Sequence, residues 1–299
     1  PRVEAPVLNA RLRRANVAGG THVASIGPHG DLTYPVEKLG ESASAVEALA
    51  AGKHPFAATL KEAKNPLVIV GAGLLRRGDR DALLKQIHKM CDDVGVVDPV
   101  TGWNGFNVLH DAGGTVAALD LGFVPSTAAA SDPDVASAPE LVFSLAAEDF
   151  DAPANAFVVY QGHHGDQAVK RADVVVPTSC FTEKEGIYVN LEGRPQISRQ
   201  VKMPLPNIKH SWEIFKKIAT ELNFEIDYNN FSELRQLMFD NYKHLSNLNS
   251  IEKGNDFKVK VNKKIFNDSE INSNIKNFYM TDSVSRQSPT MASCSLNIL

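Results

Sequence analysis

The stretch Asn65-Pro-Leu-Val-Ile-Val-Gly-Ala-Gly73 contains a short, continuous run of apolar residues that ends in two glycines. Such a run is typical of a strand that is buried on both faces of a parallel sheet. The apolar spacing that follows predicts a helix from about Asp79 to Cys91. A buried strand, a tight turn and a helix form the repeating unit of an α/β domain, so this stretch indicates the fold class.

The same pattern returns later in the chain. Three more short apolar runs end in polar residues, glycine or proline, and each predicts a strand: Leu141–Leu145, Phe157–Tyr160 and Asp173–Val176. Nearer the start, Glu4–Arg14 has the spacing of a helix and His22–Ile26 that of a short strand. Strands that alternate with helices predict a doubly wound, mostly parallel α/β domain over residues 1–206.

The composition changes after Pro206, where asparagine becomes frequent and alanine rare. Residues 207–299 are therefore predicted as a second region, with amphipathic helices around Trp212–Leu222 and Leu234–Met238. Its Lys- and Asn-rich stretch, residues 247–277, is predicted to be a poorly structured arm ahead of a C-terminal tail. Residues 126–139, rich in Ala, Ser, Asp and Pro, indicate a surface loop.

The bulk composition limits the classes of function. The 299 residues are 43% hydrophobic and carry a net charge of −4, which supports a globular core and disfavours a nucleic-acid partner. No apolar run reaches the length of a membrane-spanning helix, so direct membrane insertion is not expected. The sequence begins at Pro1 without a leader, so we expect a processed chain or a fragment that is incomplete at its N-terminus.

Two segments resemble ligand-binding loops. Gly71 and Gly73 could bring the backbone close to a dinucleotide pyrophosphate, but Arg76 stands where that motif has its third glycine, which favours a tight structural turn. After the strand ending at Tyr160, the loop with His163, His164 and Asp166 could bind a metal or exchange protons. No third cluster of ligands accompanies these three residues, which favours a hydrogen-bonded loop.

Carboxylates and thiols offer weaker candidates. Glu183 and Glu192 could form the acid and base of a hydrolase, although solvated charges in two turns are the simpler interpretation. The isolated cysteines Cys91, Cys180 and Cys294 have no metal-ligand spacing and are predicted to be reduced thiols. Cys180 as a nucleophile would need a partner histidine, so a structural thiol is favoured.

Taken in order, many short motifs resemble one family. They are Arg2–Arg13, Asp31–Tyr34, Leu39–Gly40, His54–Phe56, Lys61–Pro66, Ala117–Gly122, Tyr160–Asp166, Ala172–Pro177, Thr182–Lys184, Tyr188–Asn190, Glu192–Arg194, Phe278–Asp282, Ser285–Arg286 and Thr290–Ala292. This series is similar to the C-terminal part of the large, seventy-five-kilodalton-type iron–sulfur subunit of respiratory complex I. The resemblance is weaker over residues 207–277, which suggests a lineage-specific arm.

The resemblance implies a domain of the molybdopterin-oxidoreductase type that has lost its cofactor and acts as a scaffold in the peripheral arm of NADH:ubiquinone oxidoreductase. In this family the clusters are bound by cysteines of an N-terminal half that this sequence does not contain, and the three cysteines here do not reproduce that spacing. We therefore expect no catalytic, cofactor-binding or metal-ligating residue in the chain itself.

The implied partners are the upstream half of the same subunit and other peripheral-arm subunits. The implied location is the matrix side of the mitochondrial inner membrane, or the cytoplasmic side of the membrane in a bacterial relative. Two alternatives stay open: a working molybdopterin enzyme such as a formate dehydrogenase that uses the loop at His163 and His164, and a nucleotide-binding module that uses Gly71 and Gly73.

Overall fold

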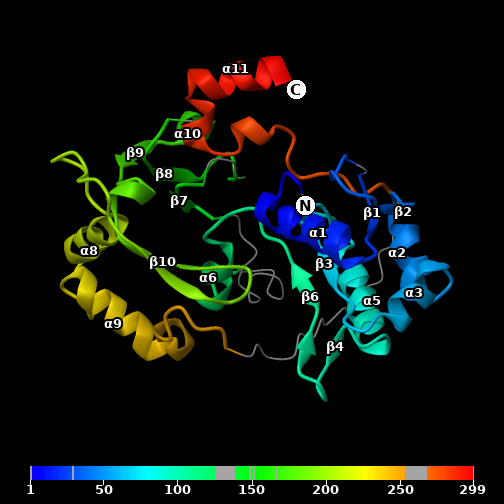
Figure 1. Ribbon diagram of the computed structural model, residues 1–299. Helices are drawn as coiled ribbons and strands as arrows, with labels where there is room; N and C mark the ends of the chain where they lie inside the picture. Colours follow the sequence, from blue (N-terminus) through cyan, green and yellow to red (C-terminus); the bar gives the residue numbers. More distant parts are fainter. Residues whose placement is uncertain are drawn as a thin grey trace. The chain divides into compact units, whose positions relative to one another are not determined.

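The computed structural model describes residues 2–28, 30–124, 139–147, 150, 152–165, 167–252 and 268–298. The chain forms two compact units, coloured along the sequence in Figure 1. Unit 1 consists of Pro1–Ala112 and Gly254–Phe278, and unit 2 of Gly113–Lys253 and Tyr279–Leu299. Both units are discontinuous in sequence. The boundary predicted from composition, at residue 206, therefore does not separate compact units and stays a prediction about the family domain.

Unit 1 alternates short strands with helices. Its elements are α1 (Pro6–Gly19), β1 (Ala24–Ile26), β2 (Glu37–Gly40), α2 (Ala43–Ala50), α3 (Phe56–Glu62), β3 (Val68–Val70), α4 (Ala72–Leu75), α5 (Arg80–Asp93), β4 (Val97–Asp98), β5 (Trp103–Asn104) and β6 (Phe106–Val108). Strands β1 and β2 pair in parallel, as do β3 and β6, whereas β4 and β5 form an antiparallel pair.

The core of unit 1 lies around α5. This helix begins after Asp79 and packs against α2, and its apolar side chains Leu83, Ile87 and Cys91 are buried at helical spacing. Helix α1 ends at Gly19 and is followed by Gly20, whose backbone adopts the left-handed conformation with a φ of 67°. The two helices and the two strands predicted for this region are thus confirmed.

A late segment of the chain returns to complete unit 1. Residues 268–274, here called the strap, pack against the turn after β3, and Ile271 belongs to the buried core cluster. The Ile271 backbone N–H donates to the carbonyl oxygen of Glu41 at 2.8 Å. The prediction of a poorly structured arm over residues 247–277 is therefore wrong for the strap, because long-range contacts give it a fixed place. Residues 253–267 lie outside the described part of the chain.

Unit 2 contains α6 (Thr115–Asp120), β7 (Leu141–Leu145), β8 (Phe157–Gly162), β9 (Val174–Pro177), the hairpin strands β10 (Gly186–Val189) and β11 (Pro195–Ser198), α8 (Ser211–Glu221), α9 (Phe231–Asn241), α10 (Ser283–Arg286) and α11 (Pro289–Ile298). The 3₁₀ turns η1 (Gln167–Arg171), η2 (Phe181–Glu183), η3 (Lys243–Ser246) and η4 (Phe278–Met280) join these elements.

The three predicted apolar strands form one parallel sheet in the order β7-β8-β9. Central strand β8 pairs Val158 with Val142 of β7 and Tyr160 with Val175 of β9. Strand β8 is the most deeply buried, because both of its edges are paired, and Phe215 of α8 packs near Phe143 with ring centroids 5.5 Å apart. The α/β class and the helices α8 and α9 are confirmed, while the loop predicted at residues 126–139 falls almost entirely outside the described residues.

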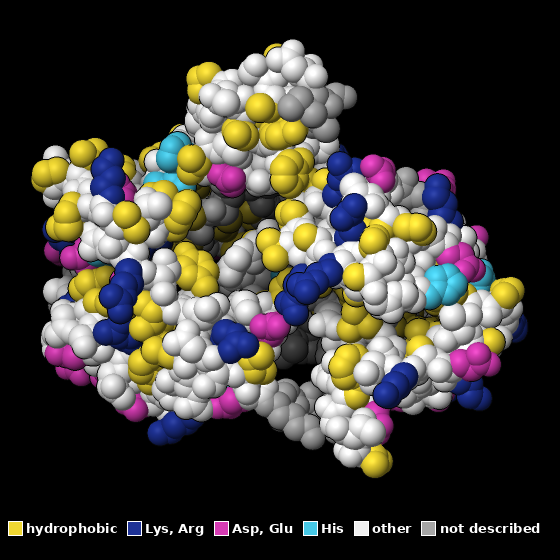
Figure 2. Space-filling view, viewed as in Figure 1, with side chains coloured by type: hydrophobic (Ala, Val, Ile, Leu, Met, Phe, Trp, Pro, Cys, Tyr) yellow, Lys and Arg dark blue, Asp and Glu magenta, His cyan; other side chains and the backbone are white. Residues whose placement is uncertain are grey.

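Charged side chains of both signs are mixed over the face drawn in Figure 2, where Lys and Arg alternate with Asp and Glu. Among the described residues, no helix is long and apolar enough to cross a lipid bilayer.

Candidate functional site

The glycine turn after β3 packs closely against other parts of unit 1, and beside it Gly73, Arg76 and Arg77 line a hollow of about 240 Å³ with residues of the strap. A Cβ atom built on Gly73 would lie 2.1 Å from the carbonyl oxygen of Asn272 in the strap, and one on Gly71 would lie 3.1 Å from a carboxylate oxygen of Glu4. The strap backbone and the Glu4 carboxylate thus approach the two glycines closely, and the carboxylate would repel a pyrophosphate at Gly71. Arg76 pairs with Asp111 at 3.1 Å. This geometry fits the tight structural turn and disfavours a dinucleotide site.

A buried ion pair fastens the strap. Arg77 binds both carboxylate oxygens of Asp79, at 2.8 and 2.9 Å, and also donates to the carbonyl oxygens of Ser269 and Glu270. The Asp79 side chain is only 2% exposed. The hydrogen bond to Asp79 raises the pKa of Arg77 above its ordinary value, although burial opposes this. The guanidinium therefore stays charged and joins the turn to the strap.

The histidine loop lies at the carboxyl end of β8, as predicted. The Nδ1 atoms of His163 and His164 are 2.7 Å apart, so one ring donates to the other. The Tyr160 hydroxyl donates to the carbonyl oxygen of His164 at 3.1 Å, and the Gln287 amide donates to that of Gly165 at 3.2 Å. Asp166, the third predicted ligand, lies outside the described residues. The two rings are thus engaged with each other within a loop that is tied down at its backbone.

The electrostatics of the loop keep His163 neutral. Burial lowers the pKa of His163, and repulsion from His164 and Lys184 lowers it further. Asp282 faces the same ring, and its own pKa is lowered: burial would raise it, but hydrogen bonds from Ser285 and Val284 outweigh that effect. A neutral histidine is a poor electrostatic anchor for an anion, so the loop has structural rather than anion-binding character.

One buried polar side chain next to this loop was not predicted from the sequence. Gln161, on β8, is fully buried, and among the described residues neither its side-chain nitrogen nor its oxygen has a hydrogen-bond partner. A buried amide without partners costs about 1–3 kcal/mol. The residue was missed because a glutamine at the end of an apolar run gives no signal that its side chain turns inward.

A second unpredicted contact joins β9 to α8. The Ser179 hydroxyl lies 2.7 Å from Nδ1 of His210, and the Thr178 hydroxyl donates to the carbonyl oxygen of Lys209 at 3.0 Å. Ser179 is completely buried, which denies a substrate access to its oxygen. His210 also precedes the first residue of α8. The serine–histidine pair therefore fastens the helix to the sheet, and no spacing in the sequence pointed to it.

The two candidate carboxylates serve separate local structures. Glu183 accepts a hydrogen bond from the backbone N–H of Cys180 at 3.0 Å, at the start of η2. Glu192 lies in the turn between β10 and β11, where it accepts from the Asn190 side chain and pairs with Arg194 at 3.5 Å. Each carboxylate is thus used within its own turn, as the simpler interpretation of the sequence predicted.

The cysteines are free thiols. Burial, with the negative charge of Asp92, raises the pKa of Cys91 to about 12, so this thiol stays protonated and unreactive. Cys180 and Cys294 are half-buried. In the part of the chain that the structure describes, no three His, Cys, Asp or Glu side chains converge as metal ligands would.

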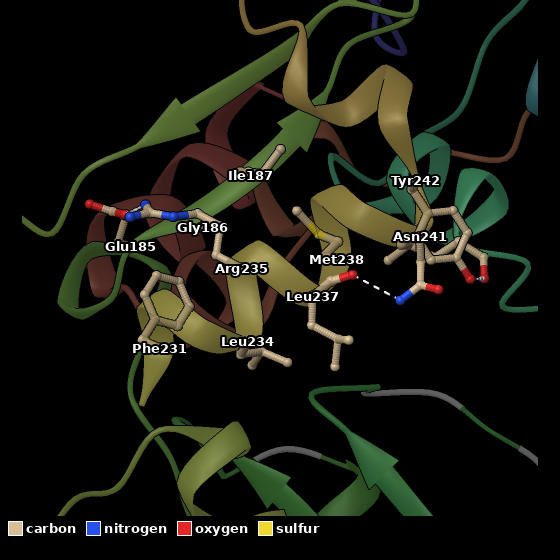
Figure 3. Close-up of a pocket in the computed structure, with 11 residues that line it drawn as sticks. Glu185, Gly186, Ile187, Phe231, Leu234, Arg235, Leu237, Met238, Asn241 and Tyr242 are labelled. Carbon is tan, nitrogen blue, oxygen red and sulfur yellow. Dashed lines mark hydrogen bonds and ion pairs between the residues drawn. The ribbon is translucent and has the colours of Figure 1, made fainter. Parts of the chain in front are cut away.

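Unit 2 contains an apolar groove of about 430 Å³. It is lined by Leu121 after α6, by Glu185, Gly186 and Ile187 at β10, and by Phe231, Leu234, Arg235, Leu237, Met238, Asn241 and Tyr242 of α9 and its end. Figure 3 shows the α9 side chains Leu234 and Met238 between the Glu185–Arg235 pair and Tyr242. The sequence predicted the helix but not this groove, because the opposing residues come from distant segments.

Comparison with known proteins places the fold in a family. The model of the molybdopterin oxidoreductase family matches residues 1–221, which is most of the chain. The chain belongs to the molybdopterin oxidoreductase family. A second model, which describes the C-terminal part of the G subunit of NADH-ubiquinone oxidoreductase, matches residues 250–294 of this family member.

Individual relatives have names that agree with the second model. The G subunit of the NADH-quinone oxidoreductase of Rickettsia felis is 38% identical over 296 residues, which cover 97% of this chain and 42% of the relative. The mitochondrial NADH dehydrogenase (ubiquinone) iron–sulfur protein 1 of Solanum tuberosum is 37% identical over 301 residues, covering 99% of the chain and 40% of the relative. The chain thus spans about two fifths of the length of these relatives, and the resemblance found in its motifs is confirmed.

The described residues do not fit the metal centre that the molybdopterin oxidoreductase family name implies. A metal ligand would need a thiolate or hydroxyl that is accessible and converges with other donors. Cys91 and Ser179 are completely buried, and the histidine rings at the end of β8 are paired with each other. No chemistry is therefore derived through a bound molybdenum or pterin.

Proposed function

We propose that this chain is a non-catalytic, structural part of the large peripheral-arm subunit of a proton-pumping NADH:quinone oxidoreductase. The observation that carries the proposal is similarity along 97–99% of the chain to relatives named as subunits of that enzyme. The C-terminal model for the same subunit, over residues 250–294, adds an independent match.

The chemistry of the candidate residues supports a scaffold. His163 and His164 pair with each other, Ser179 holds His210, and Glu183 caps a turn. Each of these groups stabilises the fold at the carboxyl ends of β8 and β9, which is the edge where α/β enzymes usually place their reacting groups. A site whose polar groups are occupied in this way supports the shape of the protein rather than a reaction.

The proposal extends to cofactors, partners and location. The remaining length of the subunit would carry the iron–sulfur clusters, while this chain binds none. Its partners would be that remaining part and the other peripheral-arm subunits. The assembly would lie at the matrix side of the mitochondrial inner membrane, or at the cytoplasmic side in a bacterium. The similarity to both a plant mitochondrial and a bacterial relative supports either setting.

Purification of an affinity-tagged chain from the cells that produce it tests the proposal. We expect the chain to be recovered in a large assembly that oxidises NADH and reduces quinone, with no stoichiometric molybdenum by elemental analysis. Recovery with molybdenum and formate oxidation would instead support a working molybdopterin enzyme. Recovery as a free chain that binds NADH in a titration would support the nucleotide-binding module.

The scaffold role also predicts how the histidine loop responds to mutation. Replacing His163 or His164 by Ala removes an imidazole that pairs with its neighbour in a half-buried loop, and the remaining ring nitrogen then loses its partner. We expect the amount of assembled complex to fall more than the NADH turnover per assembled complex. Native gel electrophoresis gives the first quantity and activity normalised to complex gives the second. Normal assembly with abolished turnover would show that the loop is catalytic.

A further inference from the structure

Helix α1 has apolar residues on two opposite sides. On one side, Leu8, Leu12 and Ala15 recur at helical spacing and are half-buried. The other side, here called the outer face, consists of residues that are all exposed: Val7, Ala10, Arg11, Arg14, Val17 and Ala18. These positions follow the spacing i, i+3, i+4 and i+7, so neighbouring side chains adjoin one another along the helix.

The outer face lacks the residues that normally face water. Val7 and Val17 are 78% and 65% exposed, and α1 contains no Lys, Asp or Glu. Over the position that α1 has in Figure 1, Figure 2 shows dark blue side chains of Lys or Arg next to yellow apolar ones. A helix that is apolar on more than one side is normally covered on each of them. The outer face therefore has the character of a contact surface.

Two arginines of the outer face have no partner within the part of the chain that the structure describes. Arg11 and Arg14 lie about one turn apart and form neither an ion pair nor a hydrogen bond there. Each of the other arginines of unit 1 forms one or the other. Arg13, for example, donates to the carbonyl oxygen of Thr33 at 3.3 Å. The outer face is thus positively charged and is complementary to a surface that carries carboxylates.

The residue types of the outer face fit a protein surface better than a lipid or a nucleic acid. Helices that lie on membranes insert Leu, Phe or Trp into the lipid, whereas the apolar residues of the outer face are Val and Ala. The net charge of −4 disfavours nucleic acid. Arginine is enriched and lysine is depleted in contacts between proteins. The 14 residues of α1 offer such a contact along about 21 Å.

The relatives indicate which protein surface lies nearest to α1. They align with 97–99% of the chain, α1 included, and about three fifths of their own length lies outside the match. The model of the C-terminal part of the G subunit matches residues 250–294, which indicates that this additional length precedes α1 in the relatives. A part of the same polypeptide that enters a few residues before Pro6 has a high effective concentration at α1.

We propose that the outer face of α1 is an interaction surface for the part of the same subunit that precedes this stretch, here called the N-terminal remainder. This inference rests on the proposed function, because it requires the chain to be part of that subunit. The N-terminal remainder presents carboxylates to Arg11 and Arg14, and apolar side chains to Val7 and Val17. The covered arginines form charge-assisted hydrogen bonds, which fix the orientation of the contact.

Cysteine labelling in the purified assembly tests whether the outer face is covered. The full-length subunit carries Val7→Cys, and maleimide incorporation is read by mass spectrometry in the tryptic peptide of residues 3–11. We expect position 7 to react at least about tenfold more slowly in the native assembly than after denaturation, because a covered thiol reacts only when the contact opens. Val100→Cys, at a valine that is 93% exposed, is the matched control and should react at similar rates in both states.

A charge reversal tests the role of the arginines. Arg14→Glu places a carboxylate opposite those of the N-terminal remainder, so we expect labelling at position 7 to become at least about tenfold faster. Arg80→Glu makes the same change at an exposed arginine of α5 and should leave the protection at position 7 unchanged. Full protection in the Arg14→Glu variant would contradict the proposed charge complementarity.

Carbodiimide crosslinking identifies the opposing surface. The reagent activates a carboxylate, and in an Arg14→Lys variant the introduced amine displaces the activating group to form an amide, with release of the spent reagent as a urea. We expect this amide to join position 14 to an Asp or Glu of the N-terminal remainder. Arg76→Lys, which lies beside Asp111, should form an amide with that residue and serves as the positive control.

Each other outcome decides against a defined part of the argument. A crosslink from position 14 to a different subunit, or no crosslink while the control reacts, would overturn the inference. So would equal labelling rates at position 7 in the native and the denatured state of an NADH-oxidising assembly, and both results would leave the proposed function standing. A chain that is not recovered in such an assembly would overturn the inference and the proposed function together.

Discussion

Gly73 shows how one residue decides between a ligand site and a structural turn. A methyl group added there would meet the Asn272 carbonyl oxygen at 2.1 Å, so the backbone of the strap would have to move. We expect Gly73→Ala to lower the free energy of unfolding of unit 1 by about 1–3 kcal/mol, as overpacking does. Urea unfolding followed by Trp103 fluorescence, with Trp212→Phe to remove the signal of unit 2, measures this.

Gly78 offers the matched control for that experiment, because a Cβ atom at this position would meet nothing within 4 Å. Gly78→Ala should therefore change stability little. If Gly73→Ala proved equally neutral, the contact between the turn and the strap would not be as close as the structure indicates.

The histidine loop should open as the pH falls. Burial lowers the pKa of His163 below its ordinary value of 6.5, so the unfolded state binds a proton more readily than the folded state. Stability from this group is complete above the ordinary pKa and is lost as the pH falls below it. We expect hydrogen-exchange protection of the amides of residues 162–165, corrected for intrinsic rates, to decrease from pH 7 to pH 5.

Replacing His163 by Gln should flatten this dependence, whereas His110→Gln controls for the loss of an imidazole elsewhere. Protection that stayed constant between pH 7 and pH 5 in the unmodified protein would mean that His163 does not resist protonation in the folded loop.

At the scale of elements, the join between the turn after β3 and the strap depends on the buried Arg77–Asp79 pair. Removing one partner leaves an unpaired buried charge, which typically costs about 3–5 kcal/mol. We expect Arg77→Ala and Asp79→Ala each to destabilise unit 1 by this order, and the double variant to cost less than the sum. Equilibrium unfolding of the three variants gives the coupling energy.

The neighbouring arginine controls for position in the sequence. Arg76 is exposed and pairs with Asp111, so Arg76→Ala should cost about 0–1 kcal/mol. Equal effects of Arg76→Ala and Arg77→Ala would show that burial does not set the strength of the contact with the strap.

Elements with strong local patterns were predictable from the sequence, and those that depend on distant partners were not. The runs at Leu141–Leu145 and Phe157–Tyr160 predicted strands because they are short, continuous and apolar, although only β8 is buried on both faces and β7 leaves Leu141, Phe143 and Leu145 exposed. The strap was missed because it contributes one buried side chain, Ile271, within a polar context. The groove was missed for a related reason. Helical spacing predicts that α9 has an apolar face, but it does not predict which distant residues lie opposite that face.

At the scale of the whole molecule, the cysteines should be dispensable for metal content. No described cluster of donors converges on Cys91, Cys180 or Cys294, and the Cys91 thiol has a pKa of about 12. We expect a variant with Cys91→Ala, Cys180→Ser and Cys294→Ser to form an assembly with unchanged iron per complex. Elemental analysis of the purified assembly measures this, with the unmodified protein as the reference. A loss of iron in proportion to the cysteines removed would contradict the prediction.

The strap also constrains when the protein can reach its final structure during translation. Arg77 and its acceptor Ser269 are 192 residues apart in the sequence. At about 5–20 residues per second, a ribosome takes on the order of 10–40 s to synthesise the stretch between them. During that interval the turn after β3 in the nascent chain contains the Arg77–Asp79 pair and Gly73. The strap, which contacts them in the folded protein, has not yet been synthesised. Chaperones that act on the growing chain would therefore encounter unit 1 without the strap.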